Sequence, residues 1–301
     1  MKYLFYFLKI LSLFLFIYLL TKANWKLCFN YFQKLNFFNT IVALLIINLG
    51  YFLKSLRWKN ILSTLKIKEN TLVLFKVFLI GGYLGIITPG KLGDFGRIYY
   101  LKKDRNWKQL LTSLLLDRLN DLVVLILLGS IAILRLKNLF PNHFEITLNN
   151  KLVILISIVL IIGIVVFKKF ESFFLEIYHS LKMSLSLKDN FYQILITLIS
   201  MGCLYGSFIL IANDLNILIA PIDILLIAFI TGILNLLPIT VLGVGVREIS
   251  IIYLFSLYGV EYDISIAFSL IIFVIQIITF LPGAFWFYKN PINLKKNHLR
   301  K

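Results

Sequence analysis

The stretch Thr88-Pro-Gly-Lys-Leu-Gly-Asp-Phe-Gly-Arg97 interrupts an otherwise apolar chain, and a related phrase, Leu237-Pro-Ile-Thr-Val-Leu-Gly-Val-Gly-Val-Arg-Glu248, returns in the second half. Each phrase follows an apolar run that is too short or too interrupted to be a plain membrane span. Each joins a helix-breaking Pro/Gly cluster to an acid and an arginine. Because broken backbone and ionisable groups are both costly in hydrocarbon, their pairing in two halves of the chain predicts a substrate site.

The composition indicates the class of protein. Hydrophobic residues make up 60% of the 301 residues, the mean hydropathy is +0.90, and several continuous apolar runs approach the length of a bilayer span. We therefore predict an all-α, polytopic helical membrane protein. The net charge of +17 fits loop lysines and arginines that set orientation and face anionic lipid, so no nucleic acid is expected as a partner. Cys28 and Cys203 are far apart, which indicates no disulfide framework and no metal site.

The apolar runs predict about six full spans and two further regions that each contain an apolar arm, a Pro/Gly break and a second arm. The two interrupted regions are Thr71–Tyr100 and Ile222–Tyr258. The expected spans lie near Tyr3–Leu20, Phe37–Leu56, Leu110–Leu134, Leu152–Phe167, Phe191–Ala212 and Asp263–Tyr288.

Charge placement predicts that both interrupted regions are re-entrant, so that each enters and leaves on one side of the membrane. With a cytoplasmic N-terminus, the cytoplasmic segments then hold about 19 basic residues, including those between Lys54 and Lys68, against about six outside. If Thr71–Ile87 were a simple span, the Lys102–Lys108 cluster would lie outside and this bias would weaken. Both termini are therefore expected in the cytoplasm.

Counting gives the relative orientation of the two re-entrant hairpins. Three full spans separate them, and three is odd, so one hairpin is expected to enter from the cytoplasm and the other from outside. Opposed hairpins that meet near the midplane are typical of inverted-repeat transporters. We expect one flippase-like transmembrane domain over residues 1–290 and a basic cytoplasmic tail over residues 291–301.

The first motif predicts a half-helix that begins at the break. Thr88 reads as an N-cap and Pro89 as a first-turn proline, so free backbone N–H groups would point toward the membrane interior. Asp94 and Arg97, three apart, would share one face. The alternative is an interfacial turn in which these two side chains pair only with each other. The glycines that would give a neighbouring backbone or a lipid headgroup close access are Gly90, Gly93 and Gly96.

The second motif places an arginine at the N-terminal, positive end of an expected helix dipole. Glu248 in a first helical turn is favourable, whereas Arg247 there adds positive charge to the positive end of the helix dipole. Such an arginine suits a phosphate, which it can bind through paired hydrogen bonds. The alternative is that Arg247 pairs only with Glu248 or Asp94. The helix-breaking residues of this motif are Pro238, Gly243 and Gly245.

A third group of charges lies inside an expected span. Arg118 stands about eight residues, on the order of 12 Å, from the end of that span, and it is flanked by Asp117 and Asp121. Three ionisable residues at that depth should face the protein interior and carry function. The alternative is a buried ion network that holds helices in register. Polar residues that could line a cavity in other spans are Tyr205, Asn235 and Gln276.

These motifs, in this order, resemble the lysylphosphatidylglycerol synthase transmembrane region family, a flippase-like membrane domain. The resemblance rests on Pro89-Gly-x-x-Gly-Asp94 followed by Arg97, on Asp117-Arg118-x-x-Asp121, and on Pro238 with Gly243-x-Gly245-x-Arg247-Glu248, and it covers about residues 5 to 288. Asp94 stands where the family more often has Glu.

The resemblance implies a lipid-flippase fold with re-entrant helices, and it carries roles onto Asp94, Arg97, Arg118, Asp121, Arg247 and Glu248. Bifunctional members of the family carry a soluble C-terminal aminoacyl-transferase domain. This chain ends at Lys301, so we do not expect it to make an aminoacylated lipid.

The function expected from the sequence is movement of a phosphate-bearing lipid, either a phospholipid or a polyprenyl-phosphate-linked lipid, between the leaflets of a bacterial plasma membrane. No cofactor, metal or catalytic residue is expected. Expected partners are lipids with an anionic headgroup, together with further copies of the chain or a membrane enzyme that makes the lipid. The alternatives are a membrane-embedded enzyme for glycosyl or phosphoryl transfer, a small-anion secondary transporter, and a structural scaffold.

Overall fold

The computed structural model describes residues 21–101, 106–136, 139, 187–235 and 245–290. Within these residues the secondary structure is helical, which confirms the all-α polytopic class. Four helices are long and apolar enough to cross a membrane. They are α3 (Phe37–Thr64), α6 (Trp107–Leu136), α9 (Leu187–Asp214) and α12 (Tyr262–Lys289). The expected spans at Tyr3–Leu20 and Leu152–Phe167 lie outside the described residues, as does the tail over 291–301.

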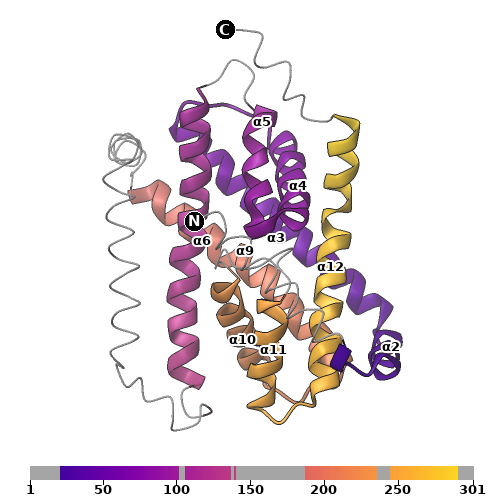
Figure 1. Ribbon diagram of the computed structural model, residues 1–301. Helices are drawn as coiled ribbons and strands as arrows, with labels where there is room; N and C mark the ends of the chain where they lie inside the picture. The colour runs from indigo at the N-terminus through magenta and orange to yellow at the C-terminus, as the bar shows by residue number, and fades with distance from the viewer. Residues whose placement is uncertain (1–20, 102–105, 137–138, 140–186, 236–244, 291–301) are drawn as a thin grey trace, which may run out of the picture.

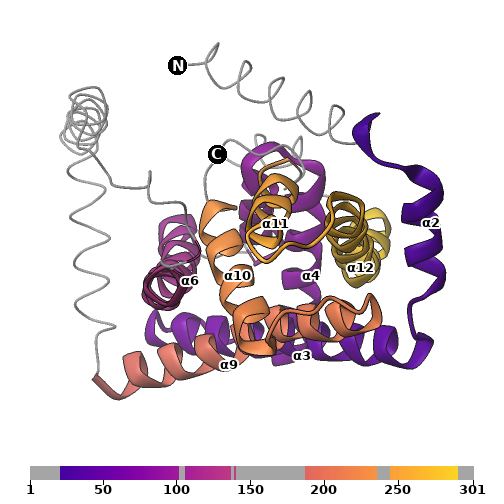
Figure 2. The same cartoon turned by 90° about the horizontal axis from the view of Figure 1, so that it is seen from below.

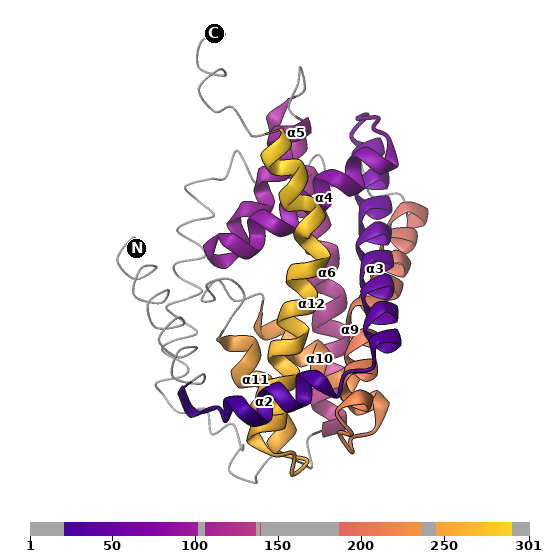
Figure 3. The same cartoon turned by 90° about the vertical axis from the view of Figure 1, so that its right-hand side faces the viewer.

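Two interrupted helical hairpins lie between the spans. The first consists of α4 (Thr71–Ile87), the 3₁₀ helix η1 (Pro89–Gly96) and the short α5 (Arg97–Leu101), and η1 folds back against α4. The second contains α10 (Pro221–Leu234) and α11 (Val246–Ser256), which pack on each other. Figures 1 and 3 agree that the first hairpin occupies one end of the molecule and the second hairpin the opposite end.

The helices form two layers. Figure 2 shows α3 and α9 side by side along one face, with the hairpins above them and α6 and α12 on the two flanks. The short helix α2 (Trp25–Gln33) runs across the end where the second hairpin lies (Figure 3). It is tied to α12 by the Asn24 backbone N–H, which donates to the Asp263 carboxylate at 3.1 Å. The hairpins are therefore enclosed on three sides by long helices.

Each hairpin packs on the membrane span that follows the other hairpin in the sequence. The arm α4 of the first hairpin packs on α12, the span that follows the second hairpin, while α10 of the second hairpin packs on α6, the span that follows the first. Glycines make both contacts close: a Cβ on Gly283 would lie 2.1 Å from the Leu79 carbonyl oxygen, and one on Gly129 would lie 2.1 Å from Ile233 Cδ1. Small residues that let helices approach are the usual means of helix association in lipid, where apolar burial alone gives little drive.

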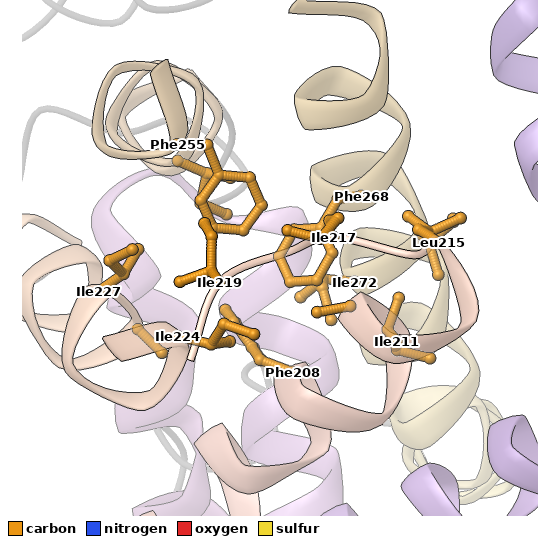
Figure 4. Close-up of a cluster of buried hydrophobic side chains, with 14 of the residues drawn as sticks. Phe208, Ile211, Leu215, Ile217, Ile219, Ile224, Ile227, Phe255, Phe268 and Ile272 are labelled. Carbon is orange, nitrogen blue, oxygen red and sulfur yellow. The ribbon is translucent and has the colours of Figure 1, made fainter. Parts of the chain in front are cut away.

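An apolar cluster holds the second hairpin to α9 and α12 (Figure 4). Phe268 of α12 is fully buried, with its ring 5.0 Å from that of Phe255 and 5.6 Å from that of Phe208, between ring centres. Aromatic pairs at such distances add about 0.5–1.5 kcal/mol each beyond the area they bury. This packing positions the second hairpin beside the polar interior of the molecule.

Candidate functional site

The spans α3 and α6 carry a buried ion network at the level of the first hairpin. Arg57 of α3 is wholly buried and donates from Nε and Nη2 to Asp117 Oδ1, at 3.0 and 2.6 Å, and from Nη1 to Asp121 Oδ1 at 2.7 Å. Arg57 also donates to the Thr197 hydroxyl of α9 at 2.6 Å. Lys54, one turn earlier on α3, donates from Nζ to the other oxygen of Asp121 at 2.8 Å. The network therefore joins three spans.

Lys54 and Arg57 were not predicted as site residues, because both were counted among the basic residues of a cytoplasmic segment. The expected span ended at Leu56, but α3 continues to Thr64, and both side chains are buried. A basic residue is tolerated inside a helix bundle when a carboxylate on a neighbouring helix offsets part of its desolvation cost. The signal available in the sequence was spacing: a cation pair three apart on one span matches an acid pair four apart, Asp117 and Asp121, on another.

The first hairpin brings two more charges to this network. Arg97 donates from Nη2 to Asp94 at 3.0 Å and to Asp117 at 3.3 Å, and its guanidinium carbon lies 4.7 Å from the ring centre of Trp58 and 4.3 Å from that of Phe78. Arg97 is completely buried inside this ion network, and it does not line the cavity that lies between the two hairpins. The pairing of Asp94 with Arg97 was one of the alternatives drawn from the sequence, and here it is one contact within a larger network.

The break at Thr88 differs from an ordinary helix cap. Thr88 ends α4, and its hydroxyl donates to the Leu84 carbonyl and accepts from the Gly93 N–H, both at 2.6 Å. Pro89 and Gly90 begin a 3₁₀ helix, and the expected α-helical half-helix does not form there. A Cβ on Gly93 would lie 2.2 Å from the Leu84 carbonyl oxygen, so the return of the chain against α4 requires glycine at this position.

Arg118 is the most exposed cation of this network. It pairs with Asp94 across the cavity and lies 4.0 Å from Asp121, and 37% of its side chain is exposed. Asp117, which precedes Arg118 in the sequence, bonds to Arg57 and Arg97 instead of to Arg118. Arg118 therefore links the first hairpin to α6 while keeping part of its guanidinium free for another anion.

The second hairpin contributes a separate charged pair. Arg247 donates from Nε to Glu248 at 3.0 Å and from Nη1 to the Gln276 side-chain oxygen at 2.9 Å, and a second contact to Glu248 comes from Nη2. Glu248 in turn accepts from the Gly245 N–H at 2.6 Å. Gly245 has φ of +99°, a conformation that favours glycine. Arg247 thus pairs with Glu248, as one alternative held, and also with α12; Pro238 and Gly243 lie outside the described residues.

A cavity of about 200 Å³ lies between the two hairpins and brings the two groups of charges into one chamber. Lys54, Asp94, Arg118 and Asp121 line one part, and Arg247 lines another. The three polar residues expected from the sequence, Tyr205, Asn235 and Gln276, all line it as well. Among the described residues, the Asn235 side-chain oxygen is buried without a hydrogen-bond partner. Apolar side chains that complete the wall include Leu125, Met201, Leu204, Phe208, Ile272 and Phe280.

The residues that line this cavity are partly charged or polar and partly apolar. Cationic and amide groups can bind an anion there, and apolar side chains can hold hydrocarbon. No three His, Cys, Asp or Glu side chains of the described residues group as a metal site. The geometry therefore suits an anionic amphiphile.

Comparison with known proteins agrees with this architecture. The model of the lysylphosphatidylglycerol synthase TM region matches residues 6–283. The chain is similar to the UPF0104 membrane protein MJ1078 of Methanocaldococcus jannaschii, with 29% identity over 233 residues that cover 71% of this chain and 97% of the relative. No solved structure matches the chain. This multi-pass membrane protein belongs to the lysylphosphatidylglycerol synthase TM region family.

Proposed function

We propose that the protein moves a phosphate-bearing lipid between the leaflets of a plasma membrane, with both termini in the cytoplasm. The observation that carries this proposal is the cavity between the two hairpins, where Lys54, Arg118 and Arg247 share one chamber with apolar side chains. A lipid headgroup needs cations and a lipid tail needs hydrocarbon, and this cavity supplies both. Membership of a membrane-domain family supports the proposal.

The hairpins supply the moving parts in this proposal. In this proposal each hairpin is re-entrant and the two enter from opposite sides of the membrane; their positions at opposite ends of the molecule support this (Figures 1 and 3). The Arg118–Asp94 pair ties the first hairpin to α6, and the Arg247–Gln276 bond ties the second to α12. A phosphate that competes for either arginine weakens the tie on its side, so that the cavity opens alternately to the two leaflets.

Reconstitution in liposomes tests the proposal. Vesicles that contain headgroup-labelled phospholipid would be scored for exchange between leaflets by quenching the outer label. The native protein should accelerate exchange, and Arg118→Ala should slow it by at least about tenfold, since a phosphate loses a charge-assisted partner. Arg135→Ala is the matched control: Arg135 lies on the same helix, but it is 54% exposed and pairs with Asp223 outside the cavity. Exchange equal to that of protein-free vesicles would refute the proposal.

A further inference from the structure

The charges around the cavity do not balance. The described cations that line it or bond to its charged lining are Lys54, Arg57, Arg97, Arg118 and Arg247. The corresponding acids are Asp94, Asp117, Asp121 and Glu248. Among the described residues, the site therefore carries one more positive charge than negative charge.

The surplus charge can be assigned to one side chain. The four arginines are matched by the four acids: Arg57 bonds to Asp117 and Asp121, Arg97 and Arg118 contact Asp94, and Arg247 bonds to Glu248. Lys54 is the additional cation, and its acid partner Asp121 keeps the Arg57 contact when the lysine is neutral. Guanidinium groups do not lose protons in proteins, whereas a lysine can. Of the cations in this site, Lys54 is thus the one able to change charge.

The position of Lys54 favours such a change. Its residue is 7% exposed, it lines the cavity, and it has two cationic neighbours, Arg57 on its own helix and Arg118 on α6. The three cations share one carboxylate, because Lys54, Arg57 and Arg118 all lie within 4.0 Å of Asp121. The other titratable groups that line the cavity are Tyr51 of α3, Asp94 of η1, Tyr205 of α9 and, from the second hairpin, Arg247.

We infer that the cavity binds a phosphodiester monoanion together with one proton, and that the proton resides on Lys54. The inference rests on the proposed function and specifies its substrate class. A headgroup with a single negative charge neutralises the site when Lys54 is protonated, whereas a diphosphate leaves further charge uncompensated. The volume of about 200 Å³ also suits a headgroup better than a diphosphate-linked sugar, since pockets for larger ligands are typically about 300–1,000 Å³.

The test measures proton uptake on binding to the purified protein in nanodiscs. The probe is dihexanoyl phosphatidylglycerol, whose phosphodiester does not titrate between about pH 6 and 9, so any proton taken up goes to the protein. Calorimetry in buffers of different ionisation enthalpy gives the number of protons bound per ligand. We expect that number to rise from about zero toward one as the pH increases, and the affinity to fall in parallel.

Three variants isolate Lys54. Lys54→Arg keeps the charge at every pH, so its affinity should be independent of pH with no proton uptake. Lys54→Met removes the charge and should weaken binding of the probe at least about tenfold at low pH. Lys59→Met, an exposed residue of the same helix, should behave as the native protein. If Lys54→Met does not fold, Lys54→Arg and the native protein still decide the question.

The outcomes separate this inference from the proposed function. Binding of the probe by the native protein without proton uptake at any pH, or unchanged uptake in Lys54→Arg, would overturn the inference and leave lipid transport standing. Farnesyl diphosphate binding more tightly than the monoanion would also overturn it. Tight binding of glycerophosphoglycerol, which has no acyl chains, without competition from the lipid would overturn lipid transport and leave the coupling of anion and proton intact. No binding of either phosphodiester would remove both.

Discussion

At the scale of single residues, the molecule separates charges that hold helices together from charges that face the cavity. Arg57 and Arg97 are completely buried and make their contacts inside the protein, while Arg118 is more than one-third exposed. The sequence could not make this distinction, because all three arginines stand next to apolar runs. The three arginines differ in which acids they contact on neighbouring helices, and those contacts depend on how the helices pack.

Replacing Arg57 tests the structural part of the network. Arg57→Met should destabilise the protein by about 3–5 kcal/mol, since it leaves Asp117 and Asp121 buried with fewer cationic partners. Thermal unfolding in detergent would show this as a lower melting temperature.

A second substitution provides the control for that experiment. Adding Asp117→Leu to Arg57→Met removes the carboxylate that loses its shortest ion-pair contact in the single variant, so the double variant should be more stable than the single one. A single variant as stable as the native protein would contradict the role given to Arg57.

At the scale of elements, long apolar runs predicted α3, α6, α9 and α12 as spans, and the Pro/Gly breaks predicted the two hairpins. Periodicity and composition are sufficient for this because spans must satisfy their own backbone in lipid. The predicted end of α3 was wrong, and a 3₁₀ helix begins at Pro89, where an α-helix was expected. Both errors occurred where a tertiary contact, to Asp117 and Asp121 or to Leu84, overrides the local signal.

The contact between α4 and α12 gives a prediction for these elements. Gly283→Ala should lower stability by about 1–3 kcal/mol, because the new methyl group would overlap the Leu79 carbonyl and force the two helices apart. Gly202→Ala is the matched control, since a Cβ there meets nothing within 4 Å. The control should melt at or above the native temperature, as alanine favours helix. Equal melting temperatures for the two variants would show that the close contact does not matter.

At the scale of the whole molecule, the opposed orientation of the hairpins in the membrane stays a prediction from counting charges and spans. The cavity that they share could not be predicted, because its walls come from helices that are distant in sequence: Lys54 of α3, Arg118 of α6 and Arg247 of α11 meet only in the folded chain. The order of the motifs indicated which residues to inspect, and the packing determined which of them face one chamber.

Labelling of single cysteines tests the overall orientation. After replacement of Cys28 and Cys203, cysteines at Lys68, before α4, and at Glu261, before α12, should react with a membrane-impermeant reagent from opposite sides of sealed vesicles. Leaving Cys28 in place would add little background, because burial, with a smaller contribution from Asp263, raises the pKa of its thiol. Reaction of both introduced cysteines from one side would refute opposed hairpins.

The crossed packing of the hairpins also sets an order for biogenesis. The ribosome releases α4 about 200 residues before the part of α12 that carries Gly283, the glycine against which Leu79 packs. During that interval α3 and α6 are completed, so Asp94 and Arg97 have partners of opposite charge as soon as the nascent chain includes Arg118. Among the described helices, the last to leave the ribosome is therefore the one that closes the first hairpin into place.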